Sequence, residues 1–254
     1  MKLFLQSDLH LEFAEALDPP PPDTEVLIWA GDIHHGVAVI EAAILQADRY
    51  GLEVVVVAGN HEFYYDDHDV VLNAMTEAAA AHPRVHFLEN DSVALGAVRF
   101  FGATFWSDFS FQGPEAAAAA RRASERTLPD YKIVTKEGTE LSTAVTLGLH
   151  RESVAKLEQW LQEPHQGPSV VITHFAPHPQ CDHPRHAGSP YTPYFISDQR
   201  RLMETYQPQL WCYGHTHDSM DFVHDKTRVI SNQGGYPKEG GVRECYRDEL
   251  NLIL

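Results

Sequence analysis

The sequence predicts an α/β fold in which strands and helices alternate and pack as layers. Short apolar runs typical of buried strands recur at 2–6, 26–30, 54–58, 170–173 and 210–213. Segments with apolar residues at helical spacing lie between several of these runs. The chain has 254 residues, 43% of them hydrophobic, which suffices for the core of one layered domain.

The first half of the chain is the most regular. A loop at 14–24 that contains four consecutive prolines separates the first two strands. The other elements expected in this half are helices at 37–50 and 70–79 and strands at 85–88 and 98–102. His86 alternates with apolar neighbours, so we interpret it as a partly exposed strand residue.

Residues 107–143 interrupt this pattern. An alanine-rich helix at 115–126 is followed by a polar stretch, and an excursion of this length is either a lid or specificity segment or a solvated insertion. The helix carries Arg121 and Arg122. We favour a surface-helix role for these cations over phosphate binding.

The second half returns to the α/β pattern. Its expected elements are a helix at 145–161, a short helix capped by Asp198 and ending at Tyr206, and late strands at 227–231 and 250–254. The loop at 176–195 contains a cysteine and three histidines that could bind zinc. Because the loop has no Cys-x-x-Cys pair, we favour a loop at the rim of an active site. These four residues are His178, Cys181, His183 and His186. We find no internal repeat and no domain linker, so 1–254 is expected to form a single domain.

Composition limits the possible partners and locations. The formal charge is −17, and two bound dications would leave −17 + 4 = −13, which disfavours long nucleic acid but permits a small phosphorylated substrate. The chain lacks an apolar run of membrane-spanning length and a signal-peptide pattern. Its three cysteines, Cys181, Cys212 and Cys245, are too few and scattered for a disulfide framework, so we expect a cytoplasmic protein.

Groups that can bind a divalent metal follow five of the predicted strands. Any one of these motifs could be an ordinary turn, but the five together are hard to explain as turns or core packing. They are Asp8-Leu9-His10, Gly31-Asp32, Gly59-Asn60-His61-Glu62, Thr173-His174 and Gly214-His215-Thr216-His217. Strand ends of this kind meet at one edge of a sheet. Imidazole, carboxylate and amide oxygen suit Mn, Fe, Zn or Ni, and the number of ligands indicates two metals about 3.5–4 Å apart.

This series of motifs resembles the calcineurin-like metallophosphoesterase superfamily over nearly the whole chain. The segment 231–237 also resembles the tail of small bacterial members. The resemblance implies a four-layer α/β/β/α sandwich of two mixed sheets flanked by helices, with a dinuclear centre. It also implies ligand roles: Asp8, His10 and His217 for the first metal, Asn60, His174 and His215 for the second, and Asp32 as the bridge.

The resemblance assigns His61 to the substrate phosphate as the catalytic residue rather than as a ligand. The family often has Gly-Asp-x-x-Asp, whose last aspartate orients this histidine, but here that position is His35. We therefore expect another partner for His61, such as Asp66 or Asp67, or none.

The expected function is that of a metal-dependent phosphoric ester hydrolase with two divalent ions, manganese favoured. A metal-bridging hydroxide would attack a small phosphate monoester or diester. The alternative is a catalytically silent scaffold of the same fold that binds a protein partner. Such a scaffold should lack ligands or His61, and none is missing. A nuclease disagrees with the acidic balance. The sequence does not predict the oligomeric state.

Overall fold

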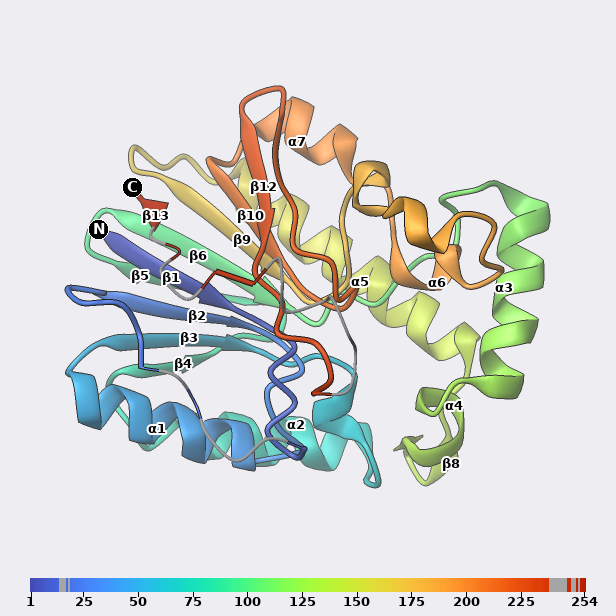
Figure 1. Ribbon diagram of the computed structural model, residues 1–254, viewed down its shortest axis with the longest axis horizontal. Helices are drawn as coiled ribbons and strands as arrows, with labels where there is room; N and C mark the ends of the chain where they lie inside the picture. Colours follow the sequence, from blue (N-terminus) through green and yellow to red (C-terminus); the bar gives the residue numbers. More distant parts are fainter. Residues whose placement is uncertain (14–16, 18, 238–245, 248–249, 251) are drawn as a thin grey trace.

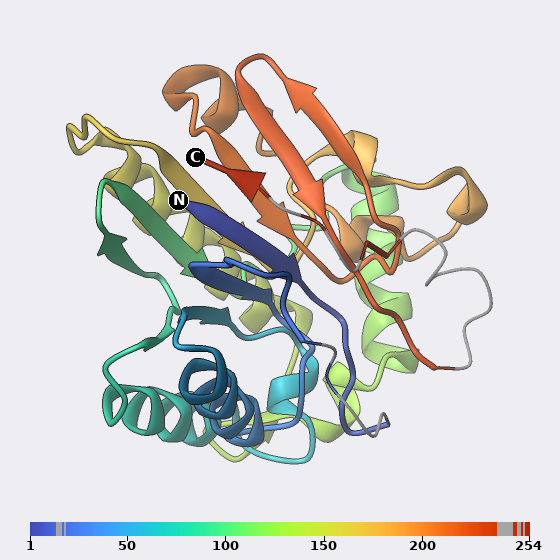
Figure 2. The same ribbon diagram turned by 60° about the vertical axis from the view of Figure 1, so that its left-hand side comes forward.

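The protein is a sandwich of two mixed β-sheets with helices on both outer faces, as predicted (Figures 1 and 2). The computed structural model describes residues 1–254 except 14–16, 18, 238–245, 248–249 and 251. The layers therefore follow the order α/β/β/α, with the two sheets packed face to face across the main apolar core.

The first sheet has the strand order β13-β1-β2-β3-β4. Its four parallel strands are β1 (Lys2–Gln6), β2 (Val26–Ala30), β3 (Glu53–Val57) and β4 (Val85–Phe87), and β13 (Leu252–Ile253) pairs antiparallel with β1. Helices α1 (Ala38–Tyr50) and α2 (His68–Ala80) cover the outer face. Since both faces are covered, these strands are apolar runs rather than alternating ones.

The second sheet has the order β11-β12-β10-β9-β6-β5. Its strands are β5 (Asp91–Leu95), β6 (Val98–Ala103), β9 (Ser169–Thr173), β10 (Leu210–Tyr213), β11 (Asp221–His224) and β12 (Thr227–Ser231). Helices α5 (Thr143–Gln162) and α7 (Arg200–Tyr206) lie on its outer face. Alternate residues of β10 serve the two cores, because Cys212 faces the first sheet whereas Trp211 and Tyr213 face the helices.

Residues 107–143 form an arm beyond the ends of the central strands. The arm contains α3 (Pro114–Thr127), α4 (Asp130–Ile133) and a small ribbon of β7 (Thr135–Lys136) and β8 (Thr139–Glu140). Helix α6 (Thr192–Phe195) packs against α3, as the right side of Figure 1 shows. The 3-10 turns η1 (His61–Phe63), η2 (Pro179–Cys181) and η3 (Pro184–His186) lie in the connecting loops.

Most elements expected from the sequence are present within a few residues of their predicted bounds. Four short strands were missed. Two of them, β5 and β11, are antiparallel edge strands with exposed residues in alternation, and each pairs with one described neighbour. The other two, β7 and β8, pair with each other in the arm. The N-cap of α7 is Gln199 rather than the predicted Asp198. The carboxylate of Asp198 still accepts a hydrogen bond from the Arg200 N–H at 3.2 Å, one residue further into the helix. Parts of the predicted loop 14–24 and strand 250–254, and Cys245, lie outside the described residues.

None of the helices in the described ranges combines the length and the apolar character that a bilayer crossing needs. The two cysteines that the structure describes, Cys181 and Cys212, are buried free thiols.

Candidate metal centre and active site

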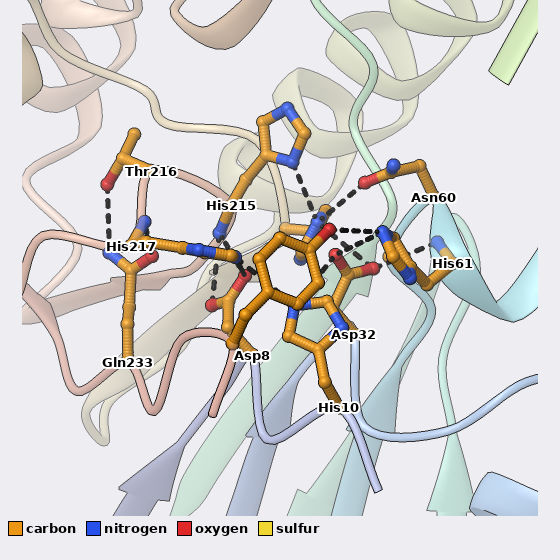
Figure 3. A network of polar contacts seen from close by, with 12 residues as sticks. Asp8, His10, Asp32, Asn60, His61, His215, Thr216, His217 and Gln233 are labelled. Carbon is orange, nitrogen blue, oxygen red and sulfur yellow. Dashed lines mark hydrogen bonds and ion pairs between the residues drawn. The ribbon is translucent and has the colours of Figure 1, made fainter. Parts of the chain in front are cut away.

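The five predicted motifs meet where β1, β2 and β3 of one sheet and β9 and β10 of the other end side by side (Figure 3). Seven of the eight predicted site residues are buried, and the eighth, His217, is half-buried. The buried seven are Asp8, His10, Asp32, Asn60, His61, His174 and His215. Residues scattered over two hundred positions therefore form one cluster, although their ligand roles stay predictions.

The first set of predicted ligands comes from the ends of β1 and β10. Nε2 of His10 lies 3.2 Å from Nε2 of His217, and that nitrogen lies 3.5 Å from Oδ1 of Asp8. Asp8 is held in place by the backbone N–H of His215, which donates to Oδ1 at 2.9 Å. These three side chains form one of the groups able to bind a metal ion.

The second set comes from β3, β9 and β10. Nε2 of His174 lies 3.1 Å from both Oδ1 of Asn60 and Nδ1 of His215. Asp32 lies between the two sets, with Oδ1 3.4 Å from His174 Nε2 and Oδ2 3.9 Å from His10 Nε2. Its two oxygens thus point toward different sets, as a bridging carboxylate requires.

The hydrogen bonds behind these side chains determine which atoms point inward. Nδ1 of His174 lies 2.8 Å from the carbonyl oxygen of Ala30, so this nitrogen carries the proton and Nε2 presents its lone pair. The amide of Asn60 donates to the Tyr64 hydroxyl at 3.0 Å, which turns Oδ1 toward the same point. Two acceptors that face each other at 3.1 Å repel unless a proton or cation lies between them. The residues therefore fit a divalent metal.

The backbone at the site is held in an uncommon conformation. Five predicted ligands have a positive φ, between 46° and 72°: Asp8, His10, Asp32, His215 and His217. Strain of this kind persists only where surrounding contacts impose it, and it clusters at functional sites. Gly214 explains one tight approach, since a Cβ there would lie 2.7 Å from Oδ2 of Asp8.

The charges of the cluster stabilise one another. Burial opposes ionisation of Asp32, but His174 and His61 hold its pKa well below the usual range. Burial likewise disfavours charged His174, yet Asp32 outweighs it and raises the pKa of His174 to about 9. The site thus favours positive charge among its carboxylates even before a metal binds.

His61 has a carboxylate partner, but not one of those expected. Oε1 of Glu12 lies 3.0 Å from Nδ1 of His61 and 3.1 Å from Nδ1 of His10. The prediction of Asp66 or Asp67 was wrong because their side chains are engaged elsewhere: Asp67 accepts from Asp69 and Gly138 and Asp66 from Asp67.

Sequence reasoning missed Glu12, although a signal existed. Asp8, His10 and Glu12 alternate along the chain, and only the first two were interpreted as site residues. Burial disfavours ionised Glu12, but hydrogen bonds from His10 and His61 lower its pKa to about 2. Burial likewise lowers the pKa of His61, yet Asp32 and Glu12 together raise it to about 9.

Tyr236 from the tail segment 231–237 covers the centre. Its hydroxyl lies 2.9 Å from Nε2 of His61, and its ring stacks on His10 with centroids 4.2 Å apart. In the same segment, Oε1 of Gln233 accepts from the His217 N–H at 2.6 Å and its amide donates to Thr216 at 2.9 Å (Figure 3). The tail therefore braces the last ligand loop.

Glu62 is a second buried carboxylate that the sequence did not assign. It accepts from the backbone N–H groups of Gly59 at 2.7 Å, Ile33 at 2.8 Å and Asp32 at 3.0 Å. It joins the loop after β2 to the loop after β3. Burial and the charge of Asp32 raise its pKa to about 7 despite these donors.

A cavity of about 260 Å³ opens beside the centre. Its walls are the loop at 176–196, α6 and the arm, so the prediction of a rim loop is confirmed. The zinc alternative finds no support, because His178 and His183 accept hydrogen bonds from the turns η2 and η3. Among described residues, neither Arg121 nor Arg122 lines the cavity, and Arg121 donates to Thr143 instead.

The fold and the cluster define a metal-dependent hydrolase. The family model described as calcineurin-like phosphoesterase matches residues 1–219, and the chain belongs to this family. It is accordingly a metal-dependent phosphoric ester hydrolase, as predicted. Among curated protein sequences, none is similar enough to the chain to be matched.

Solved structures share the fold at low sequence identity. The phosphopantetheinyl hydrolase from Mycobacterium tuberculosis superposes with a TM-score of 0.77 at 20% identity, over 99% of this chain and 95% of that one. The protein TT1561 of Thermus thermophilus gives 0.52 at 10% identity, over 91% and 88%. These similarities support the fold of the whole described chain.

The backbone donors at Glu62 lead to a prediction about stability. In Glu62→Gln the new amide must turn an N–H toward the backbone N–H groups, so the free energy of unfolding should fall by about 1–3 kcal/mol. Urea unfolding of the metal-free protein measures it, with the exposed Glu77→Gln as the matched control. Equal stabilities of the two variants would contradict the bracing role of Glu62.

Proposed function

We propose that the protein hydrolyses a small phosphate monoester or diester with two divalent ions, manganese favoured. One ion would be held by Asp8, His10 and His217, and the other by Asn60, His174 and His215, with Asp32 shared. The observation that carries this proposal is the position of Asp32 between two sets of inward-facing acceptors. We also propose that 1–254 acts as one catalytic domain and that it works in the cytoplasm, because the chain has few cysteines and the two described ones, Cys181 and Cys212, are free thiols.

When bound, a pair of divalent ions neutralises phosphoryl oxygens and lowers the pKa of bound water toward about 7. The chain supplies the positioning and the proton chemistry. His61 lies over Asp32, with Nε2 4.0 Å from Oδ2, and it is the buried imidazole beside both sets that belongs to neither in our assignment. We assign it to stabilising charge on the phosphoryl oxygens and to protonating the leaving oxygen.

Glu12 is the proposed positioning residue for His61. A carboxylate at 3.0 Å from Nδ1 keeps the proton on that nitrogen, so Nε2 faces the substrate space in a single orientation. Because the same oxygen also contacts His10, Glu12 couples the orientation of His61 to that of a predicted ligand.

The structural comparison suggests which phosphate esters to test first. A similar structure is described as a phosphopantetheinyl hydrolase. We propose that the substrate panel include a phosphopantetheinyl ester beside p-nitrophenyl phosphate, its bis-ester and cyclic nucleotides. Metal analysis of chelator-free protein, followed by this panel, tests the function. If the metal-free protein is reconstituted with metal and still hydrolyses no ester of the panel, the result contradicts the proposal and favours the silent scaffold.

Substitutions separate ligands from the catalytic imidazole. Asp32→Asn and His215→Ala should reduce turnover at least about a thousandfold, because several kcal/mol of charge stabilisation is lost with the metals. His61→Ala should reduce kcat by about 10²–10⁴ while metal content stays near two per chain. Steady-state kinetics and elemental analysis measure both. A His61→Ala protein as metal-poor as His215→Ala would refute the division of roles.

A double-mutant cycle tests Glu12. Glu12→Gln should lower kcat by about tenfold to a hundredfold in the wild-type background, yet have little further effect in His61→Ala, because it acts through that imidazole. The loss should be larger for alkyl than for p-nitrophenyl esters, since poor leaving groups need the proton more. Because Glu12 also contacts the predicted ligand His10, the metal content of each variant is measured as a control.

A relocated carboxylate provides the rescue for the same cycle. His35 approaches Glu12, with its Nε2 3.6 Å from Oε1. In Glu12→Gln/His35→Asp, the family-type aspartate should restore part of kcat, whereas Glu12→Gln/His35→Asn should not. If the losses of kcat in Glu12→Gln and His61→Ala multiply in the double variant, and His35→Asp restores no activity, Glu12 has only a structural role.

A further inference from the structure

Tyr236 contacts the proposed catalytic imidazole and two predicted ligands at once. Its hydroxyl oxygen lies 2.9 Å from Nε2 of His61, the nitrogen that faces the substrate space in the proposed chemistry. Its ring stacks on the imidazole of His10, with centroids 4.2 Å apart, and meets the ring of His217 edge-on at 4.8 Å. The phenol therefore lies beside the atoms that a bound phosphoryl group must reach.

The chain before Tyr236 is anchored at the ends of both sheets. The N–H of Gly234 donates at 2.9 Å to the carbonyl of Ser7, just after β1. The N–H of Gln233 donates at 2.9 Å to the hydroxyl of Ser219, which precedes β11. A hydroxyl that follows so constrained a segment is held in place before a substrate binds. Such a preorganised donor needs no reordering during the reaction.

Tyr236 also forms part of the wall of the cavity beside the centre. It is half-buried, and it lines the cavity of about 260 Å³ together with His61, Asp32 and His215. A phosphoryl group that reaches the predicted ligands through this cavity would lie against the phenol and the imidazole together.

The described lining of this cavity offers little positive charge of its own to a phosphoryl group. It includes no lysine, and its guanidinium, that of Arg185, is engaged with Asp218 at 2.9 Å and with the His217 carbonyl at 3.3 Å. Hydrogen bonds to charged oxygens are stronger than those between neutral groups. A hydroxyl donor beside His61 would therefore contribute appreciably to stabilising the phosphoryl oxygens.

The spacing of the two groups allows each to serve a different oxygen. In the proposed chemistry, the Nε2–H of His61 protonates the leaving oxygen. A phenol hydroxyl can accept from such an N–H and donate its own proton at the same time. Neighbouring oxygens of one phosphoryl group are close enough together to face two groups that are 2.9 Å apart. The hydroxyl of Tyr236 is thus positioned for a non-bridging oxygen next to the leaving one.

We propose that Tyr236 is a second catalytic residue, whose hydroxyl donates to a non-bridging phosphoryl oxygen in the transition state while His61 serves the leaving oxygen. The proposal rests on the proposed function and adds a residue to its site. The phenol keeps its proton throughout, and no covalent bond to Tyr236 forms or breaks.

Removing only the hydroxyl tests this role. Tyr236→Phe keeps a ring that packs against His10 and His217, and its kcat for p-nitrophenyl phosphate should fall about tenfold to a hundredfold at unchanged metal content. Tyr191→Phe is the matched control and should keep the wild-type kcat, because the Tyr191 hydroxyl contacts that of Thr127 at 3.0 Å, away from the cavity lining that the structure describes. A Tyr236→Phe protein as active as the wild type, or one whose lower kcat follows a loss of metal, overturns the inference.

The leaving group separates the role of Tyr236 from that of His61. The loss of kcat in Tyr236→Phe should be equal for alkyl and p-nitrophenyl esters, because both have the same non-bridging oxygens, whereas the loss in His61→Ala should grow for the alkyl esters. A loss in Tyr236→Phe that also grows for alkyl esters would place the phenol in the path of the proton. A kcat/KM above that of the wild type would show that the hydroxyl obstructs the substrate. Either result overturns the assignment.

A binding measurement keeps this inference separate from the proposed function. If p-nitrophenyl phosphate is hydrolysed equally by Tyr236→Phe and the wild type, the proposed function stands and the role of Tyr236 fails. If no ester is hydrolysed, calorimetry of the metal-loaded protein with orthovanadate, a mimic of the phosphoryl transition state, still decides. Vanadate bound about tenfold more weakly by Tyr236→Phe, and as in the wild type by Tyr191→Phe, supports the donor, and equal affinities overturn it.

Discussion

The structure depends on a cluster of buried acceptors that cannot be stable without positive charge among them. His174 Nε2 faces both Asn60 and His215 at 3.1 Å, and Asp32 adds a carboxylate 3.4 Å away. In a dry interior such an arrangement is favourable only when cations or protons lie between the acceptors. The positive φ angles and close glycines around it follow from that requirement, because ligands must converge from separate strand ends.

The hydrogen bonds that join the edges of the two sheets also hold the site together. Asn232 at the end of β12 donates to the Leu5 carbonyl in β1 at 2.8 Å, and Ser7 pairs with Gln233 beside it. Asp8 then accepts from the His215 N–H across this junction. A shift of one sheet against the other would therefore separate the ligands before it exposed much core, so the large apolar core serves as the rigid support of the metal centre.

Local patterns explain why so much could be predicted. Uninterrupted apolar runs such as β3 indicate strands covered on both faces, and parallel strands bring the residues after them to one edge. The edge strands β5 and β11 were not predicted, because their pairing is decided by a single neighbouring strand rather than by their own hydrophobic pattern. The proximity of Asp130 and Tyr194 could not be predicted either, since 64 residues separate them in the sequence and only the packing of the arm brings both to one cavity.

Glu12 shows what a motif leaves out. The family pattern would have an aspartate at position 35 orient the imidazole, and its replacement by His35 suggests a defect if positions are compared one by one. The imidazole of His61, however, is oriented by an oxygen atom near Nδ1, whichever residue supplies it. Glu12 places such an oxygen 3.0 Å from Nδ1, and it lies in the loop after β1 instead of the loop after β2. Because those loops follow adjacent parallel strands, a carboxylate can move from one to the other while the local field at His61 is kept. Judging whether such a site is complete therefore requires the positions of atoms around the imidazole.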